Sequence, residues 1–226
     1  MATERRNPLA SLVAACLWTT VATATPTTNI WNPNTDIQPK GVVHLGVDNY
    51  FSFQANHRPY AAPTDLGLTY GLPYGFEVGV DVFQPQRHPL VFNAKWGVAE
   101  RKLVPAFAVG IQGVGVHKTT SANIVYGLAA KSWERYGRLT AGPYVGAKNV
   151  IGSDNVGAIA AWDRAFGKRW WASVDWASGN NANGALAVGG SFKFTSKVSL
   201  IAGYVHYNSK AYYQNDALTT QLDIDF

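Results

Sequence analysis

Charge, cysteine and long apolar runs are all scarce in this sequence. Asp, Glu, Lys and Arg make up 15 % of the 226 residues, against about 25 % in soluble globular domains. Cys16 is the only cysteine, which excludes an intramolecular disulfide and a haem site of the C-x-x-C-H kind. Downstream of 1–24, no apolar run reaches the ~20 residues that a membrane-spanning helix needs. Disulfide-stapled domains and helical membrane proteins are therefore excluded.

Aromatic residues and glycine are abundant instead. Phe, Trp and Tyr make up 13 % of the chain, with 8 Trp and 11 Tyr, and there are 22 Gly. The net charge is +5 and the isoelectric point is near 9.3, but Lys and Arg are dispersed, so no nucleic-acid partner is predicted. Few charges, many aromatics and no spanning helix indicate a closed β-barrel with lipid outside.

The first residues are typical of a secretory signal peptide. Arg5 and Arg6 form a positive start, the apolar run 9–21 follows, and Ala22-Thr23-Ala24 is an A-x-A cleavage site. We therefore expect a signal peptide over 1–24 and a mature protein that begins at Thr25. A second interpretation takes the sequence before Cys16 as a lipobox, with Cys16 as the lipidated residue.

The last nine residues, 218–226, alternate in character, with Thr220 as the one departure. One parity is mainly apolar and ends in Phe226, and the other carries Gln221, Asp223 and Asp225. A strand sends alternate side chains to opposite faces, so one face of this strand is apolar and the other polar. The pattern resembles the final strand of bacterial outer-membrane β-barrel proteins, which ends in Phe and is read by the barrel assembly machinery.

The same alternation continues through the chain. We expect about twelve strands, with ten or fourteen as alternatives, each near the ~10 residues that a tilted membrane strand needs. Their expected positions are 41–54, 64–72, 75–84, 90–99, 103–116, 122–132, 138–149, 156–166, 169–178, 185–195, 197–207 and a last strand ending at Phe226. The predicted fold is all-β: a transmembrane antiparallel up-and-down barrel over 41–226, in the bacterial outer membrane.

In each strand, the alternate residues that are mainly apolar are expected to face lipid, and the residues between them are expected to face the lumen. In 122–132 this assigns Ile124, Tyr126 and Leu128 to the lipid face and Lys131 to the lumen. The alternation loses phase near Gly113, which predicts a β-bulge. The phase of 156–166 is ambiguous.

An even strand number puts both barrel ends in the periplasm. The short turns near 72–74, 100–102, 134–136, 167–168 and 195–197 are then periplasmic, and the loops near 55–63, 85–89, 117–121, 150–155, 179–184 and 208–217 are external. All are short, so none is expected to plug the barrel. Residues 25–40 contain three prolines and cannot form a regular strand. We interpret them as a periplasmic lead-in, with insertion into the lumen as the alternative.

Enzymatic sites are not evident, and no cofactor is predicted. Twelve-stranded outer-membrane phospholipases carry a His-x-Ser pair on the outer wall. The residues two positions after the five histidines of this chain are Gly46, Pro59, Leu90, Thr119 and Asn208. None is serine, so that motif is absent.

Charged residues of inward parity are the remaining candidates for function. The candidate pore-lining residues are Asp48, Asp81, Lys95, Asp175, Glu77, Lys131, Lys148, Lys193 and Asp223, and Asp65 and Asp225 share their inward parity. In one interpretation these groups select small hydrophilic solutes or ions in a passive pore. In the other they pair and close the interior, and the barrel anchors or partners another envelope protein. The expected partners are outer-membrane lipid, lipopolysaccharide and, through Phe226, the assembly machinery.

Closure of the barrel makes one specific contact predictable. The last strand must pair with the first, since a barrel has no free edge. His44 and Asp223 both lie about four residues from the periplasmic end, with inward parity. We therefore expect His44 to lie beside Asp223 or Asp225, with contact of each residue to lumen water only as the alternative.

Overall fold

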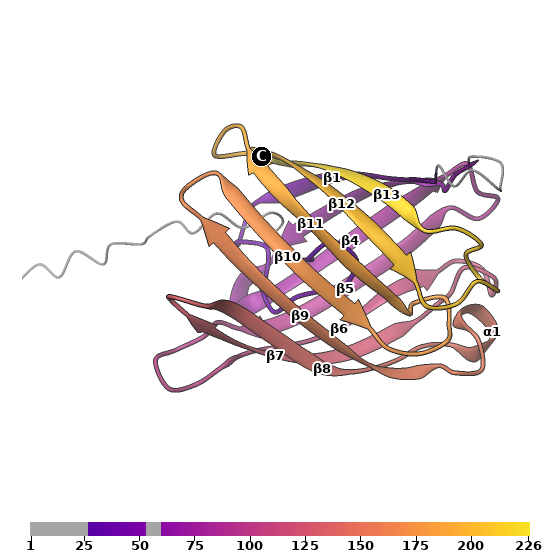
Figure 1. The fold of residues 1–226 in the computed structure, drawn as a ribbon, viewed down its shortest axis with the longest axis horizontal. Helices are drawn as coiled ribbons and strands as arrows, with labels where there is room; N and C mark the ends of the chain where they lie inside the picture. Colours follow the sequence, from indigo (N-terminus) through magenta and orange to yellow (C-terminus); the bar gives the residue numbers. More distant parts are fainter. Residues whose placement is uncertain (1–26, 53–59) are drawn as a thin grey trace, which may run out of the picture.

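The computed structural model describes residues 27–52 and 60–226. They form a single closed barrel of tilted strands (Figure 1). The expected signal peptide and the lipidation of Cys16 lie outside the described residues.

Twelve strands build the barrel wall. They are β1 (Val43–Ser52), β3 (Thr64–Gly71), β4 (Phe76–Gln84), β5 (Leu90–Val98), β6 (Ala106–Gly115), β7 (Ile124–Trp133), β8 (Gly137–Val145), β9 (Val156–Phe166), β10 (Trp170–Ala177), β11 (Ala185–Lys193), β12 (Val198–Tyr207) and β13 (Ala217–Asp225). Each pairs antiparallel with its neighbours in sequence, and β13 pairs with β1 to close the sheet. The two-residue strand β2 (Tyr60–Ala61) adds to the end of β1. The predicted all-β barrel of twelve strands is confirmed.

Two short helical turns interrupt the connections, η1 (Pro73–Gly75) and α1 (Lys148–Ile151). Among the described residues, no helix has the length and apolar character needed to cross a membrane.

The outer wall is apolar because each strand turns one parity outward. Leu68 is 46 % exposed, Val109 53 % and Trp170 59 %, whereas the alternate residue Ser173 is 1 % exposed. The predicted parity is confirmed for most strands. Large apolar side chains this exposed around a closed sheet fit lipid as the surrounding solvent.

The parity predicted for 122–132 is wrong. Ile124, Tyr126 and Leu128 are 3–6 % exposed and point inward, whereas Val125 and Trp133 are about half exposed. The reason is local: the interior here is an apolar cluster that includes residues of β8, β9 and α1. Both faces of β7 are therefore largely apolar, and alternation cannot distinguish them.

The predicted bulge is confirmed in β6. The register with β5 shifts between Phe92 and Ala94, and opposite it Gly113 has a φ of +69°. That region of φ favours glycine. The amide of Gly113 donates to Oδ1 of Asn93 at 2.9 Å, so the bulge holds the Asn93 side chain in place over the lumen.

The two ends of the barrel differ, as predicted. At one end, which we call the turn end, lie η1 and Phe226, whose amide donates to the Val43 carbonyl at 2.9 Å. At the other, which we call the loop end, lie α1 and the longer connections (Figure 1). The expected loop 55–63 lies partly outside the described residues.

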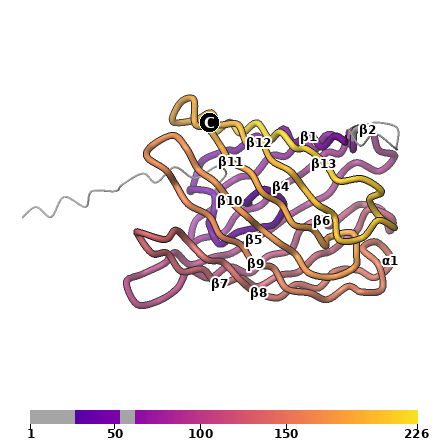
Figure 2. Tube along the Cα trace, in the orientation of Figure 1, coloured from indigo at the N-terminus to yellow at the C-terminus, as the bar shows by residue number. Residues whose placement is uncertain are grey.

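Residues 27–40, which we call the N-terminal segment, lie inside the barrel. Figure 2 shows the indigo trace crossing the interior, and Ile30, Asn32 and Gln38 are 1–2 % exposed. The segment leaves the lumen at the turn end, where the backbone of Lys40 forms an isolated parallel β-bridge with Gly71. For these residues the periplasmic lead-in is therefore wrong, and insertion into the lumen is right. The barrel needs no long loop to fill it, because the chain before β1 enters it.

The loop 208–216 at the loop end is organised by Asp216. Its carboxylate accepts hydrogen bonds from the Tyr204 hydroxyl at 2.7 Å and the Tyr207 amide at 3.2 Å, with His206 Nδ1 at 2.9 Å and Lys210 Nζ also in contact. Partial burial alone would raise the pKa of Asp216, but the hydrogen bonds, that of Lys210 first, lower it to about 2.

We predict that this loop keeps its order in moderate acid. A carboxyl whose pKa is depressed on folding stabilises the folded state above its unfolded pKa of about 3.9, and loses this effect as pH falls through its folded value. Protection of the Tyr207 amide from hydrogen exchange, corrected for intrinsic rate, should therefore stay constant from about pH 7 to 4 and fall toward about pH 2. Asp216→Asn should reduce it already at neutral pH. Equal protection in both proteins would contradict this role.

Candidate functional site

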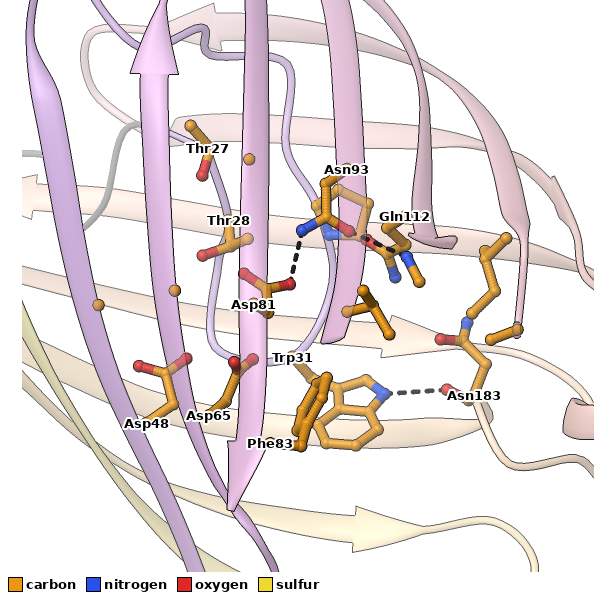
Figure 3. Close-up of a pocket in the computed structure, with 18 of the residues that line it drawn as sticks. Thr27, Thr28, Trp31, Asp48, Asp65, Asp81, Phe83, Asn93, Gln112 and Asn183 are labelled. Carbon is orange, nitrogen blue, oxygen red and sulfur yellow. Dashed lines mark hydrogen bonds between the residues drawn. The ribbon is translucent and has the colours of Figure 1, made fainter. Parts of the chain in front are cut away.

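A cavity of about 520 Å³ lies between the N-terminal segment and the wall formed by β1 and β3 to β6. It extends from Pro63 and Thr120 at the loop end to Glu77 and Lys95 deeper in the barrel. Figure 3 shows side chains of the strands and of the N-terminal segment around it. A volume of this size suits a small solute.

Three carboxylates form one wall of the cavity. Asp48 on β1 is directly opposite Asp65 on β3, and Asp81 on β4 is opposite Gly67. Neither Asp48, Asp65 nor Asp81 belongs to an ion pair in the part of the chain that the structure describes. Like charges directly opposite each other destabilise a sheet, so this wall favours a positive charge in the cavity.

Neighbouring residues position these carboxylates. Asn93 Nδ2 donates to Asp81 Oδ2 at 2.5 Å, and the bulge at Gly113 holds Asn93. Gly67 leaves room for Asp81, since a Cβ at position 67 would lie 2.9 Å from Asp81 Oδ1. Asp65 Oδ1 is buried and has no hydrogen-bond partner among the described residues, so the protein does not use this acceptor itself.

Glu77 and Lys95 form a neutral pair toward the turn end. They are direct cross-strand partners, with Lys95 Nζ 3.3 Å from Glu77 Oε1. Lys95 also donates to the Thr27 carbonyl at 2.9 Å, and Glu77 accepts from the Gln38 amide at 2.7 Å. Glu77 and Lys95 therefore pair with each other, and both also hold the N-terminal segment.

Asp175 does not face the cavity, although it is one of the predicted pore-lining residues. It is fully buried under the tip of the N-terminal segment. Its carboxylate accepts hydrogen bonds from the amides of Ile30 at 2.9 Å and Asn32 at 3.0 Å, and from Asn32 Nδ2 at 2.7 Å. Asp175 points inward, as predicted, but its carboxylate anchors the N-terminal segment instead of lining the cavity.

Arg138 is a second anchor, and sequence reasoning missed it. Its guanidinium lies 2.6 Å from Asp36 on the N-terminal segment and 2.8 Å from Asp163 on β9, and Trp171 Nε1 donates to Asp163 at 3.1 Å. Alternation could have identified Arg138 as a lumen residue, because position 138 has the same inward parity as Thr140 in the expected strand 138–149. Asp36 gave no signal, because its segment has no periodicity.

Three predicted lumen lysines do not line the cavity. Lys131 has outward parity in β7 and pairs with Glu100 at 2.6 Å near the turn end. Lys148 is exposed at the start of α1, because β8 ends at Val145. Lys193 has inward parity but is the last residue of β11, at the turn end.

The pair of Lys131 and Glu100 affects the pKa of Glu100. Burial alone would raise this pKa, and the hydrogen bond from Lys131 is the largest of the effects that lower it below its ordinary value.

The predicted contact across the closing seam is confirmed. His44 is the direct partner of Asp225 in the register of β1 and β13. His44 Nδ1 lies 2.9 Å from Asp225 Oδ1, and Nε2 lies 3.4 Å from Asp223 Oδ1. His44 and Asp223 both line the cavity, so Asp48, Glu77, Asp81, Lys95 and Asp223 are the predicted residues that the structure brings together there.

One comparison with a solved structure agrees with the barrel. No family model and no curated protein matches the sequence. Among solved structures, the chain is similar to a KdgM porin with a TM-score of 0.54 and 10 % identity, over 80 % of this chain and 98 % of that one. A mutant of Rh. blastica porin matches with a TM-score of 0.41 and 16 % identity, over 92 % of this chain and 69 % of that one. The likeness to the KdgM porin shows a shared porin-like fold.

Proposed function

We propose that this protein is an outer-membrane barrel that forms a small passive pore for small hydrophilic solutes or ions, and that it prefers cations. The observation that carries the proposal is the cavity in the lumen with three carboxylates on one wall. Fixed negative charges in a low-dielectric channel raise the local concentration of cations and repel anions. The apolar outer wall and the porin-like fold support the location in a membrane.

Single-channel recording in planar bilayers tests the proposal. The wild-type protein should conduct and prefer cations. Asp48→Asn, Asp65→Asn and Asp81→Asn together should lower the cation-to-anion permeability ratio at least about tenfold at low salt, because three charges at about 8 Å in water each contribute about 0.5 kcal/mol. A control with Glu134→Gln, in the exposed turn between β7 and β8 and outside the 520 Å³ cavity, should keep the ratio. An unchanged ratio in the triple variant would remove the assigned role of the wall.

A second candidate function has an observation in its favour. The N-terminal segment fills the lumen near Lys95 and Arg138 and pairs their charges. This favours a non-conducting barrel that anchors or partners another envelope protein. Absence of conductance in the wild type and in a variant lacking the segment would support this second function.

We also propose that the assembly machinery recognises the last strand. Phe226 is 63 % exposed beyond the end of β13, so it is accessible to a partner. Deletion of Phe226 should reduce the amount of protein in the outer membrane without blocking secretion into the periplasm. Fractionation and immunoblotting measure both. Deletion that leaves outer-membrane levels intact would contradict recognition through this residue.

A further inference from the structure

The N-terminal segment is one wall of the cavity. Thr28, Trp31 and Pro33 line it together with the three carboxylates, and Figure 3 shows Thr28 and Trp31 around the same space as Asp48, Asp65 and Asp81. A second cavity of about 370 Å³ near the turn end is bounded by Thr35 and Asp36 of the same segment. Any solute that crosses the lumen must therefore pass along this segment.

The tip of the segment is held by a built site in the barrel wall. Four donors converge on the carboxylate of Asp175: the amides of Ile30, Trp31 and Asn32, and the side chain of Asn32. In addition, Gln221 Nε2 donates to the Ile30 carbonyl at 2.7 Å. A buried carboxylate that accepts several backbone amides fixes the path of that backbone.

Trp31 extends the wall toward the loop end. Its ring makes edge contacts with Tyr50 at 5.6 Å and with Tyr207 at 5.4 Å between centroids, and its Nε1 donates to the Asn183 carbonyl at 2.9 Å. Aromatic packing of this kind adds rigidity to a side chain that already has a hydrogen bond. The segment is thus held both at its tip and at the side of the cavity.

The space left open is the acid-lined side. The segment covers Asp175 and pairs with Arg138, whereas Asp48, Asp65 and Asp81 stay in contact with the cavity. We propose that the N-terminal segment is a fixed inner wall of the pore, anchored by Asp175, which confines solutes to the acid-lined side and so determines both the width and the charge preference of the pore. This inference rests on the pore proposed above.

Release of the anchor tests the inference. Asp175→Asn places an amide group against backbone donors and should free the tip. Ser173→Ala is the matched control: it lies two residues away on β10, is 1 % exposed, and its hydroxyl has no hydrogen-bond partner among the described residues. The release should raise single-channel conductance at least about twofold and lower the cation-to-anion permeability ratio, whereas Ser173→Ala should change neither. Heat-modifiable migration on gels shows that each barrel is folded.

The position of the segment is read independently of conductance. Asn29 is fully buried, so in a Cys16→Ser background Asn29→Cys should react slowly with a membrane-impermeant thiol reagent. Asp175→Asn should accelerate the reaction at least about tenfold. A disulfide between Ile30→Cys and Gly203→Cys should restore the wild-type conductance of the Asp175→Asn protein until it is reduced, since a Cβ at position 203 would lie 3.1 Å from Ile30 Cγ2.

The outcomes separate the two proposals. Faster labelling with unchanged conductance and selectivity would overturn the inner wall and leave the pore intact. A silent wild type with a conducting Asp175→Asn protein would mean that the segment closes the pore, which also overturns the inner wall. Silence of every variant would overturn the pore. If Asp175→Asn does not release the segment, a folded variant lacking 27–36 must show the larger, less selective conductance, and wild-type values there would overturn the inference.

Discussion

Leu68→Arg should prevent the barrel from assembling in the membrane. Leu68 lies at the middle of β3 with its side chain 46 % exposed on the outer wall. An arginine at the midplane of the lipid face of a β-barrel costs roughly 2–4 kcal/mol, which is a large share of the stability of most proteins. We expect loss of the folded, heat-modifiable form from the outer membrane and accumulation of unfolded protein.

Thr69→Arg is the matched control for this prediction. Position 69 is the next residue along β3 and lines the cavity, so the same side chain would face the lumen, close to Asp81. The control should assemble, and it should weaken the preference for cations because it adds a positive charge to the acid-lined side. Equal assembly of both arginine variants would contradict a lipid-facing outer wall.

The barrel was predictable because a membrane-spanning strand has to alternate. Strand β9 begins and ends where the sequence analysis places it, at 156 and 166, even though its phase was ambiguous. In that strand Ala160 is only partly buried on the outside, and Ile159 and Ala161 are buried on the inside. The local sequence thus determines where a strand begins and ends. When one face of the strand consists of small residues, however, the sequence does not show which face points to the lumen.

The prediction failed where the interior is not polar. It assumed that the lumen collects polar side chains, which holds for Asp48 and Asp81 but not for Tyr126 and Leu128. Those residues pack against Ile151 of α1, which folds over the loop end. An apolar lumen cluster of this kind depends on contacts between distant parts of the chain, and a single strand does not reveal it.

The candidate site was only partly predictable for a similar reason. The inward carboxylates could be identified from parity, but parity does not show which of them the N-terminal segment covers. Asp175 meets Asn32 across 143 residues of sequence, and Arg138 meets Asp36 across 102. Residues 27–40 have no periodic pattern, so their path through the lumen is fixed by these long-range hydrogen bonds and ion pairs.

Arg138→Met should destabilise the folded protein strongly, because it leaves two carboxylates without their cation. The Arg138 side chain is 14 % exposed, and it lies between Asp36, which is 30 % exposed, and Asp163, which is 8 % exposed. Removal of one partner from a buried ion pair costs roughly 3–5 kcal/mol. Because Asp36 is partly solvated, we expect the lower end of that range, about 3 kcal/mol.

Urea unfolding in detergent micelles, followed by tryptophan fluorescence, measures this effect. Trp171 is a suitable reporter, since its Nε1 donates to Asp163. Arg135→Met is the control, because Arg135 lies in the turn before β8 and its ring contact with Tyr136 is at 5.8 Å on the exposed surface. Asp36→Asn combined with Arg138→Met should recover part of the loss, since one unpaired charge is then removed. A midpoint for Arg138→Met equal to that of the control would show that solvent, rather than Arg138, neutralises these carboxylates.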